Sequence, residues 1–158
     1  KGVDVFVELA RRLPQYRFTL IVNGSRNDIM TFFSDLPTNI QVYPAQKSVF
    51  EFLYSTDLVL NLSIPSLWVE TFGLTLLEAM AYGLPVISPP VGGPVELVKN
   101  DYNGFLVDSR ELDLVIEKII YILESGEYER LSNNAKDKSL LFDNVDMINK
   151  IEAQIKNI

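Results

Sequence analysis

The sequence contains neither histidine nor cysteine. Histidine is the side chain that most often serves as a general base or a metal ligand, so both roles must fall to other groups. The absence of cysteine excludes disulfides, thiol nucleophiles and thiolate-bound metals, and it fits a reducing compartment. Any chemistry on this chain must therefore use carboxylates, amides, lysine or arginine, or a group supplied from elsewhere.

Basic residues are also few, because 14 Lys and Arg stand against 21 Asp and Glu and give a formal charge of −7. Such a surface repels a phosphate backbone, so we expect no nucleic acid partner. The longest apolar runs have the length of strands, so no segment is expected to span a membrane, and no signal peptide is recognised at the start. We therefore expect a cytoplasmic protein.

A length of 158 residues with 47% hydrophobic residues predicts one folded domain over residues 1–158. The chain opens with Lys1 rather than methionine, which leads us to expect a domain of a longer protein.

Strand-like and helix-like patterns alternate along the chain. We expect strands at 18–22, 40–43, 58–62, 86–88 and 105–107. We expect helices at 3–13, 27–36, 48–55 (with a capping box at Ser48), 73–82, 94–99, 110–124, 128–141 and 145–155. This alternation predicts an α/β fold with a doubly wound, Rossmann-like parallel sheet. Ligands of such sheets bind beyond the carboxyl ends of the strands, at the loops after residues 22, 43, 62 and 88.

The stretch 65–88 carries the strongest signal of a binding site. Gly73 is expected to open a helix, and the first amides of that helix, at Leu74, Thr75 and Leu76, would have no acceptor within it. Such amides and the helix dipole attract an anion, and glycine allows a phosphate to approach closely. The hydroxyl of Thr75 adds a further donor.

Two carboxylates flank this helix start. Glu70 precedes it, and Glu78 lies four residues after Leu74 on the same helical face. Carboxylates beside a phosphate site suit a ligand that also carries vicinal hydroxyls, such as a sugar nucleotide. Taken singly, these features have plainer explanations: Glu78 as a solvated helix position, and Gly73 as a helix cap.

The whole pattern resembles the group 1 retaining glycosyltransferases of GT-B fold. The resemblance rests on Glu70 to Ile87, which is similar to the family's E-x7-E region, and on five further segments in the same order: residues 1–4, 21–24, 55–66, 92–98 and 103–107. It implies the carboxy-terminal half of such an enzyme, which binds a nucleotide diphosphate sugar.

The resemblance also implies roles for single residues. Glu70 would contact the hexose and stabilise an oxocarbenium-like transition state, and Glu78 would hold the ribose hydroxyls. Lys1 would neutralise the departing diphosphate. The backbone amides of Phe72, Gly73, Leu74 and Thr75 would cradle the diphosphate, and Thr71 would also belong to the sugar-donor site. No metal or other cofactor is expected.

Other residues have two open interpretations. Asn23, Gly24, Pro44 and Ala45 would lie near the nucleobase, or they form plain turns. Gly92 and Gly93 with Glu96 resemble a feature near the sugar donor, or they open a helix. Trp68 is expected as a core plug rather than a substrate platform or an interdomain contact. The helix at 145–155 would pack on the other domain.

The chain departs from the family pattern in two ways. A strand that ends in Gly-Arg and an acceptor-binding amino-terminal domain are both missing ahead of Lys1. We therefore expect weak sugar-donor binding and no transfer by the isolated chain. A non-catalytic sugar-nucleotide module and another GT-B enzyme, such as a sugar-nucleotide epimerase or a phosphorylase, are the alternatives. The nucleobase, the sugar and the acceptor stay open; a lipid-linked or polysaccharide acceptor would fit a place at the inner face of the membrane.

Overall fold

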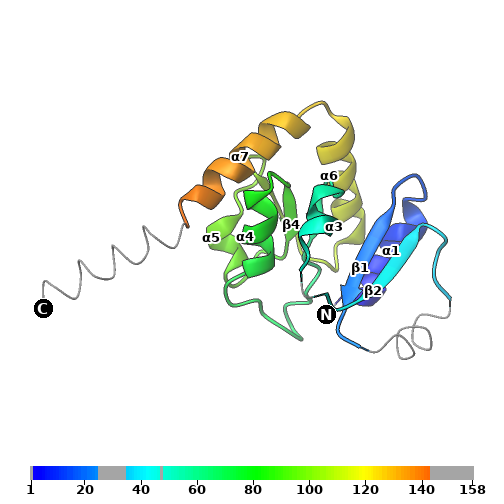
Figure 1. Ribbon diagram of the computed structural model, residues 1–158. Coiled ribbons are helices and arrows are strands. Elements are labelled where there is room, and N and C mark those ends of the chain that lie inside the picture. Colours follow the sequence, from blue (N-terminus) through cyan, green and yellow to red (C-terminus); the bar gives the residue numbers. More distant parts are fainter. Residues whose placement is uncertain (1, 25–34, 47, 143–158) are drawn as a thin grey trace, which may run out of the picture.

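The computed structural model describes residues 2–24, 35–46 and 48–142. The helices are α1 (Val3–Arg12), α3 (Phe50–Tyr54), α4 (Leu74–Ala81), α5 (Pro94–Leu97), α6 (Leu112–Glu124) and α7 (Tyr128–Leu140). The strands are β1 (Phe18–Val22), β2 (Ile40–Pro44), β3 (Val59–Leu60), β4 (Val86–Ser88) and β5 (Gly104–Leu106). From β2 to α6 strands and helices alternate along the described ranges, and α7 follows α6 directly (Figure 1). None of the described helices combines the length and the apolar character needed to cross a bilayer.

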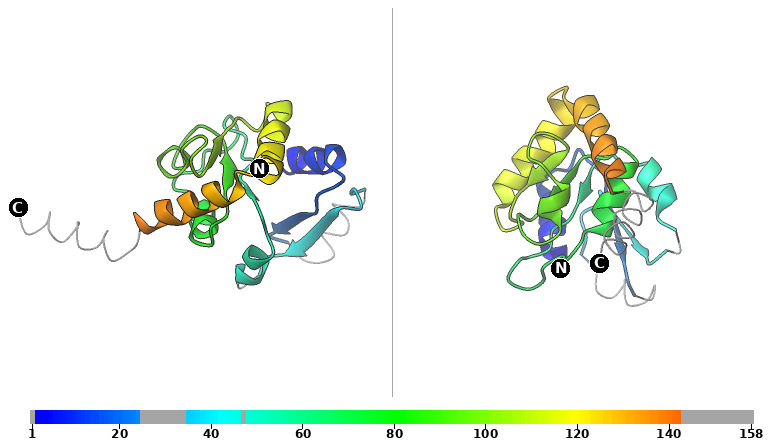
Figure 2. Two further views of the ribbon diagram at one scale, coloured as in Figure 1. Left: turned by 90° about the horizontal axis from the view of Figure 1, so that it is seen from above. Right: turned by 90° about the vertical axis from the view of Figure 1, so that its left-hand side faces the viewer.

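All strand pairs in this part of the chain are parallel, which confirms the α/β class. The strands are divided between two sheets, one with the order β1-β2 and one with the order β3-β4-β5. Within the described residues no hydrogen-bonded ladder joins β1 to β3. The parallel strands are thus divided into two parts within the described residues. Figure 2 shows the β1–β2 sheet with α1 at one end of the molecule and the β3–β5 sheet with α4 to α7 at the other.

Side chains, rather than backbone ladders, hold the two halves together. A single buried cluster takes Leu9 from α1, Phe18 from β1, Ile87 from β4 and Ile119 from α6. A second cluster joins α4 to α3, β4, α5 and α7, and its member Met80 is fully buried. Burying an aliphatic side chain is worth roughly 1.5–3 kcal/mol, so the shared cluster fixes the first sheet against the second.

Several element boundaries differ from the sequence expectation because polar side chains bond to nearby backbone. The third helix begins at Phe50, and the predicted capping box at Ser48 is wrong: the Ser48 hydroxyl accepts a bond from the Phe50 amide, 3.4 Å away. Strand β3 ends at Leu60, since Asn61 Oδ1 accepts the amide of Ser63 at 3.0 Å and turns the chain.

The later helices are shortened in the same manner. The amide of Lys99 donates to Asn103 Oδ1 at 2.8 Å, and α5 stops at Leu97. Asp108 accepts the amide of Arg110 at 2.9 Å, and α6 starts only at Leu112. The predicted helices at 27–36 and 145–155 lie largely or wholly outside the described residues.

Candidate functional site

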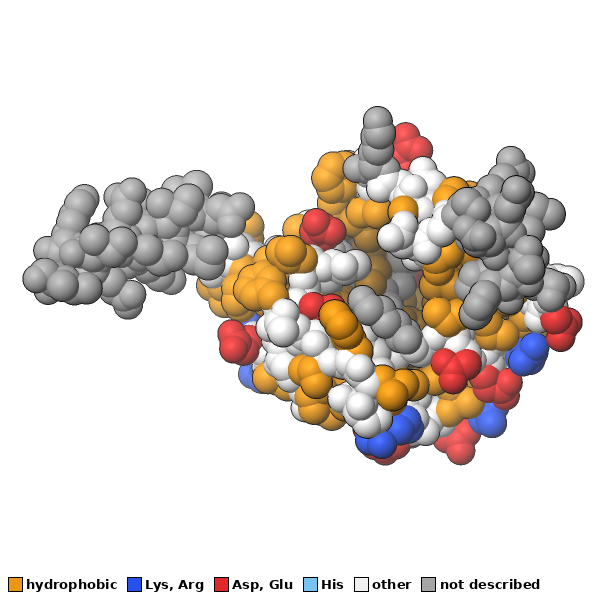
Figure 3. Space-filling model, turned by 90° about the horizontal axis from the view of Figure 1, so that it is seen from below, with side chains coloured by type: hydrophobic (Ala, Val, Ile, Leu, Met, Phe, Trp, Pro, Cys, Tyr) orange, Lys and Arg blue, Asp and Glu red, His pale blue; other side chains and the backbone are white. Residues whose placement is uncertain are grey.

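The carboxyl ends of the strands and the starts of α1 and α4 share one edge of the molecule, the lower edge in Figure 1. Figure 3 shows this edge face-on: a hollow separates two lobes, and apolar side chains line both of its walls. The backbone of Gly2 lies against the carbonyl of Leu62, so the start of α1 touches the loop that leaves β3. The strand ends and helix starts at which we expect a ligand therefore share one edge, and both halves of the molecule contribute to it.

Helix α4 opens at Gly73 as expected. Gly73 is the N-cap, with φ 85° and ψ 42°, a left-handed conformation that glycine adopts without steric cost. Its carbonyl accepts the amides of Leu76 at 2.9 Å and Leu77 at 3.0 Å. The expectation that the Leu76 amide is free is therefore wrong, because the first turn tightens onto Gly73.

Two amides at this helix start stay available. Within the described part of the chain, no hydrogen bond is found from the amides of Leu74 and Thr75, and no side chain caps the helix. The side chains of both residues are exposed, and that of Phe72 is 40% exposed, so packed apolar groups do not cover the opening. Free amides at the positive end of a helix dipole form an anion site.

The two carboxylates occupy different surroundings. Glu70 is half-buried in the loop before α4, and its carbonyl oxygen accepts the amide of Gly93 at 2.9 Å. Glu78 is exposed on the solvent face of α4, opposite the buried Leu76 and Met80. In the described ranges neither carboxylate forms an ion pair or a side-chain hydrogen bond, which leaves both as acceptors for ligand hydroxyls.

The residues expected near a nucleobase come together at the end of the first sheet. In the β1–β2 register Val22 faces Pro44, so Asn23 and Gly24 leave the sheet beside Ala45. Asn23 and Ala45 are exposed. Their roles stay predictions, as does that of Lys1, which lies outside the described residues.

Trp68 is 51% exposed, so the expectation of a core plug is wrong. The amides of Leu67 and Trp68 both donate to the carbonyl of Ile64 at 2.9 Å, which closes a turn that projects from the edge. Leu67 (73% exposed) and Val69 (46%) share this exposure, so the loop ahead of Glu70 has an apolar, accessible tip.

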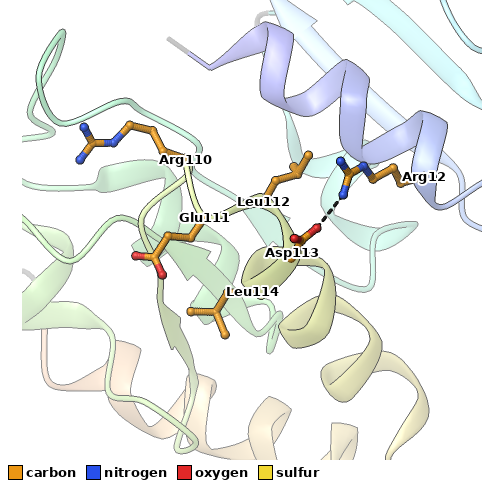
Figure 4. A pocket seen from close by; sticks show the side chains of 6 residues that line it. All are labelled: Arg12, Arg110, Glu111, Leu112, Asp113 and Leu114. Atoms are coloured by element: carbon orange, nitrogen blue, oxygen red, sulfur yellow. Dashed lines mark hydrogen bonds and ion pairs between the residues drawn. The ribbon is translucent and has the colours of Figure 1, made fainter.

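A separate groove of about 370 Å³ lies between α1 and the start of α6 (Figure 4). Both of its arginines are paired: Arg12 with Asp113 and Arg110 with Asp108, each at 2.6 Å. Hydrogen bonds from Arg110 hold the pKa of Asp108 below its ordinary value. These pairings leave the groove without an unpaired arginine that could bind an anion.

No group of three or more acidic side chains is placed to hold a metal ion within the described ranges. The residues that the sequence interpretation undervalued are Gly92 and Gly93, whose backbone packs directly on Glu70 and Phe72. Their only sequence signal is the Gly-Gly-Pro turn, which equally suits a simple helix entry.

Comparison with known proteins gives matches over most of the chain. Residues 1–138 match the family described as glycosyl transferases group 1. An uncharacterized glycosyltransferase of Methanocaldococcus jannaschii is 31% identical over 145 residues, which cover 86% of this chain and 36% of that protein. A sucrose synthase of Melioribacter roseus is 42% identical over 71 residues, 42% of this chain and 9% of the relative.

Crystal structures share the fold. A glycosyltransferase from Rickettsia africae superposes with a TM-score of 0.82 at 23% identity, over 98% of this chain and 43% of that one. Anabaena HepE in complex with UDP gives a TM-score of 0.81 at 24% identity, over 100% of this chain and 46% of that one. The chain thus spans less than half the length of each of these four proteins.

Proposed function

The chain belongs to the family of group 1 glycosyl transferases, and on that basis we propose that it is the sugar-donor-binding domain of a hexosyltransferase. The full-length protein would transfer a hexose from a nucleotide diphosphate sugar to an acceptor with retention of configuration. The UDP bound to HepE supports a uridine nucleotide as the first nucleotide to test.

The observation that carries the proposal is the open start of α4. The free amides of Leu74 and Thr75 would bind the diphosphate, with Thr71, Phe72 and Gly73 completing the cradle. Glu70, whose backbone is fixed by Gly93, would contact the hexose and stabilise the positive charge that develops on it. Glu78 would accept the ribose hydroxyls.

The remaining parts of the site would come from both halves of the molecule. Asn23, Gly24, Pro44 and Ala45, at the end of the first sheet, would flank the nucleobase. Lys1, which precedes Gly2 in the sequence, would neutralise the departing diphosphate. These groups would bind the sugar donor without a metal ion, because amides and a lysine can stabilise a leaving diphosphate by themselves.

The interruption between the two sheets supports a further part of the proposal. A strand ahead of Lys1 would pair with β1 on one side and β3 on the other, and would complete one doubly wound sheet. An amino-terminal domain would supply the acceptor site. Without these parts the isolated chain would bind the sugar donor weakly and would not transfer sugar. A lipid-linked acceptor would bring the full-length protein to a membrane surface.

The test uses the full-length protein and a calorimetric panel of uridine, guanosine and adenosine diphosphates and their sugar esters, together with a transfer assay. Glu70→Gln should lower turnover by about 100-fold or more while UDP binding survives. Glu129→Gln makes the same charge change on an exposed position of α7 and should leave turnover unchanged. Nucleotide binding without turnover for any sugar would instead support a non-catalytic binding module.

A further inference from the structure

The loop that leads into α5 packs on the loop that carries Glu70, backbone against backbone. The amide of Gly93 donates to the carbonyl oxygen of Glu70 at 2.9 Å. Gly92 lies so close that a Cβ there would sit 2.1 Å from the same oxygen. The backbone position of Glu70 is therefore set by a segment more than 20 residues further along the chain.

Gly93 leaves no room for any side chain. A Cβ at this position would lie 2.4 Å from the Cα of Phe72 and 2.5 Å from the carbonyl oxygen of Thr71. These distances are about 1 Å short of ordinary contact. The dihedral angles of Gly93, φ −56° and ψ −35°, suit any residue. The need for glycine at this position therefore comes only from the close approach of the Glu70–Phe72 loop.

The start of α4 is held by other contacts. Gly73 is buried, and a Cβ added to it would lie 3.2 Å from the side chain of Leu97 in α5. The carbonyl of Gly73 accepts hydrogen bonds from the amides of Leu76 and Leu77. A side chain on Gly93 would therefore shift residues 70–72 more than the amides of Leu74 and Thr75.

We propose that Gly93 is a positioning residue for Glu70. Its amide holds the Glu70 carbonyl, and the absence of a side chain on Gly93 lets residues 70–72 pack closely against it, which directs the Glu70 carboxylate toward the sugar. This inference rests on the proposed function, in which Glu70 acts on the transferred hexose. It also has a consequence that does not depend on activity: the contact with Gly93 keeps the backbone of residues 69–73 in a fixed position.

The first arm compares Gly93→Ala with Gly126→Ala in the full-length protein. Gly126 has φ 86°, and a Cβ added there would have no neighbouring atom within 4 Å, so its substitution adds backbone strain without touching the site. Gly93→Ala should lower kcat by about 100-fold, a loss that a 1 Å misplacement can cause, with a much smaller change in KM for the sugar donor and in UDP affinity. Gly126→Ala should keep kcat. Equal kcat in Gly93→Ala and the unmodified protein would overturn the inference and leave the proposed function intact.

The second arm is amide hydrogen exchange on the same proteins, followed residue by residue. The Gly93 amide should be protected in the unmodified protein, and Gly93→Ala should speed exchange across 69–73 while α6 and α7 keep their protection. Unchanged exchange in 69–73 would overturn the inference even if the protein proves to have no transferase activity. A general loss of protection together with a parallel fall in UDP affinity and kcat would show that Gly93 only supports the fold, and would also overturn it.

Discussion

The backbone of Gly2 lies directly against the carbonyl oxygen of Leu62, so that a Cβ on Gly2 would sit 1.9 Å from that oxygen. Gly2 also has φ 68°, a conformation that other residues adopt only at a cost. Through this contact the start of α1 meets the loop that runs from β3 to Glu70. The glycine is thus required both by its conformation and by its neighbour.

Replacing Gly2 by alanine should therefore destabilise the fold by about 3 kcal/mol, from the sum of left-handed strain and steric overlap. Chemical unfolding followed by circular dichroism measures this change. Gly126→Ala carries the strain without the overlap and should cost only about 1 kcal/mol. An equal loss of stability in Gly2→Ala and Gly126→Ala would show that the carbonyl of Leu62 does not lie tightly against Gly2.

Asn103 is fully buried and serves two backbone groups at once. Its side-chain nitrogen donates to the carbonyl of Leu97 at 2.9 Å, and its oxygen accepts the amide of Lys99 at 2.8 Å. Asn103→Ala would leave the buried carbonyl of Leu97 and the part-buried amide of Lys99 without these partners, and should cost about 2 kcal/mol in the free energy of unfolding. The exposed Asn133 of α7 offers the control, since Asn133→Ala should be neutral or slightly stabilising. A loss no larger than that of typical surface substitutions would contradict the role assigned to Asn103.

Tyr16 makes stability depend on alkaline pH. Removal of its ring from water, and then the hydrogen bond that its hydroxyl donates to Glu124, raise the pKa of Tyr16 from 10.0 to about 12. Since the folded form keeps the proton longer than the unfolded form, the contribution of Tyr16 is complete below pH 10 and is lost as the pH rises to about 12. Urea unfolding should show the unmodified protein losing stability over this window more steeply than Tyr16→Phe. Parallel pH profiles for the two proteins would refute this assignment.

The helix start at Gly73 could be predicted from sequence because its cause is local. A glycine after an irregular loop and before apolar residues at helical spacing is typical of a helix start, because glycine is among the residues preferred at the N-cap. The limits of β3 and α5 were harder to place, since they depend on which backbone amide Asn61 and Asn103 reach. Such short side-chain bonds compete with regular structure in ways that apolar periodicity does not reveal.

Longer-range relations could not be predicted from local pattern. The approach of Gly93 to Glu70 and the exposure of Trp68 depend on how two loops pack once both sheets have formed. The candidate site residues could be identified from the sequence, but which of them lie in contact depends on tertiary packing.

The most direct test of the account measures UDP binding by calorimetry in full-length protein with Thr75→Glu. Thr75 is exposed in the first turn of α4, where a carboxylate interacts favourably with the helix dipole, so the free energy of unfolding should stay the same or rise slightly. The same carboxylate would occupy the proposed diphosphate site, and UDP affinity should fall by about tenfold or more, while uridine binds as before. Asn133→Glu adds the same charge on α7 and should bind UDP normally. If Thr75→Glu binds UDP as tightly as the unmodified protein, the diphosphate does not bind at the start of α4.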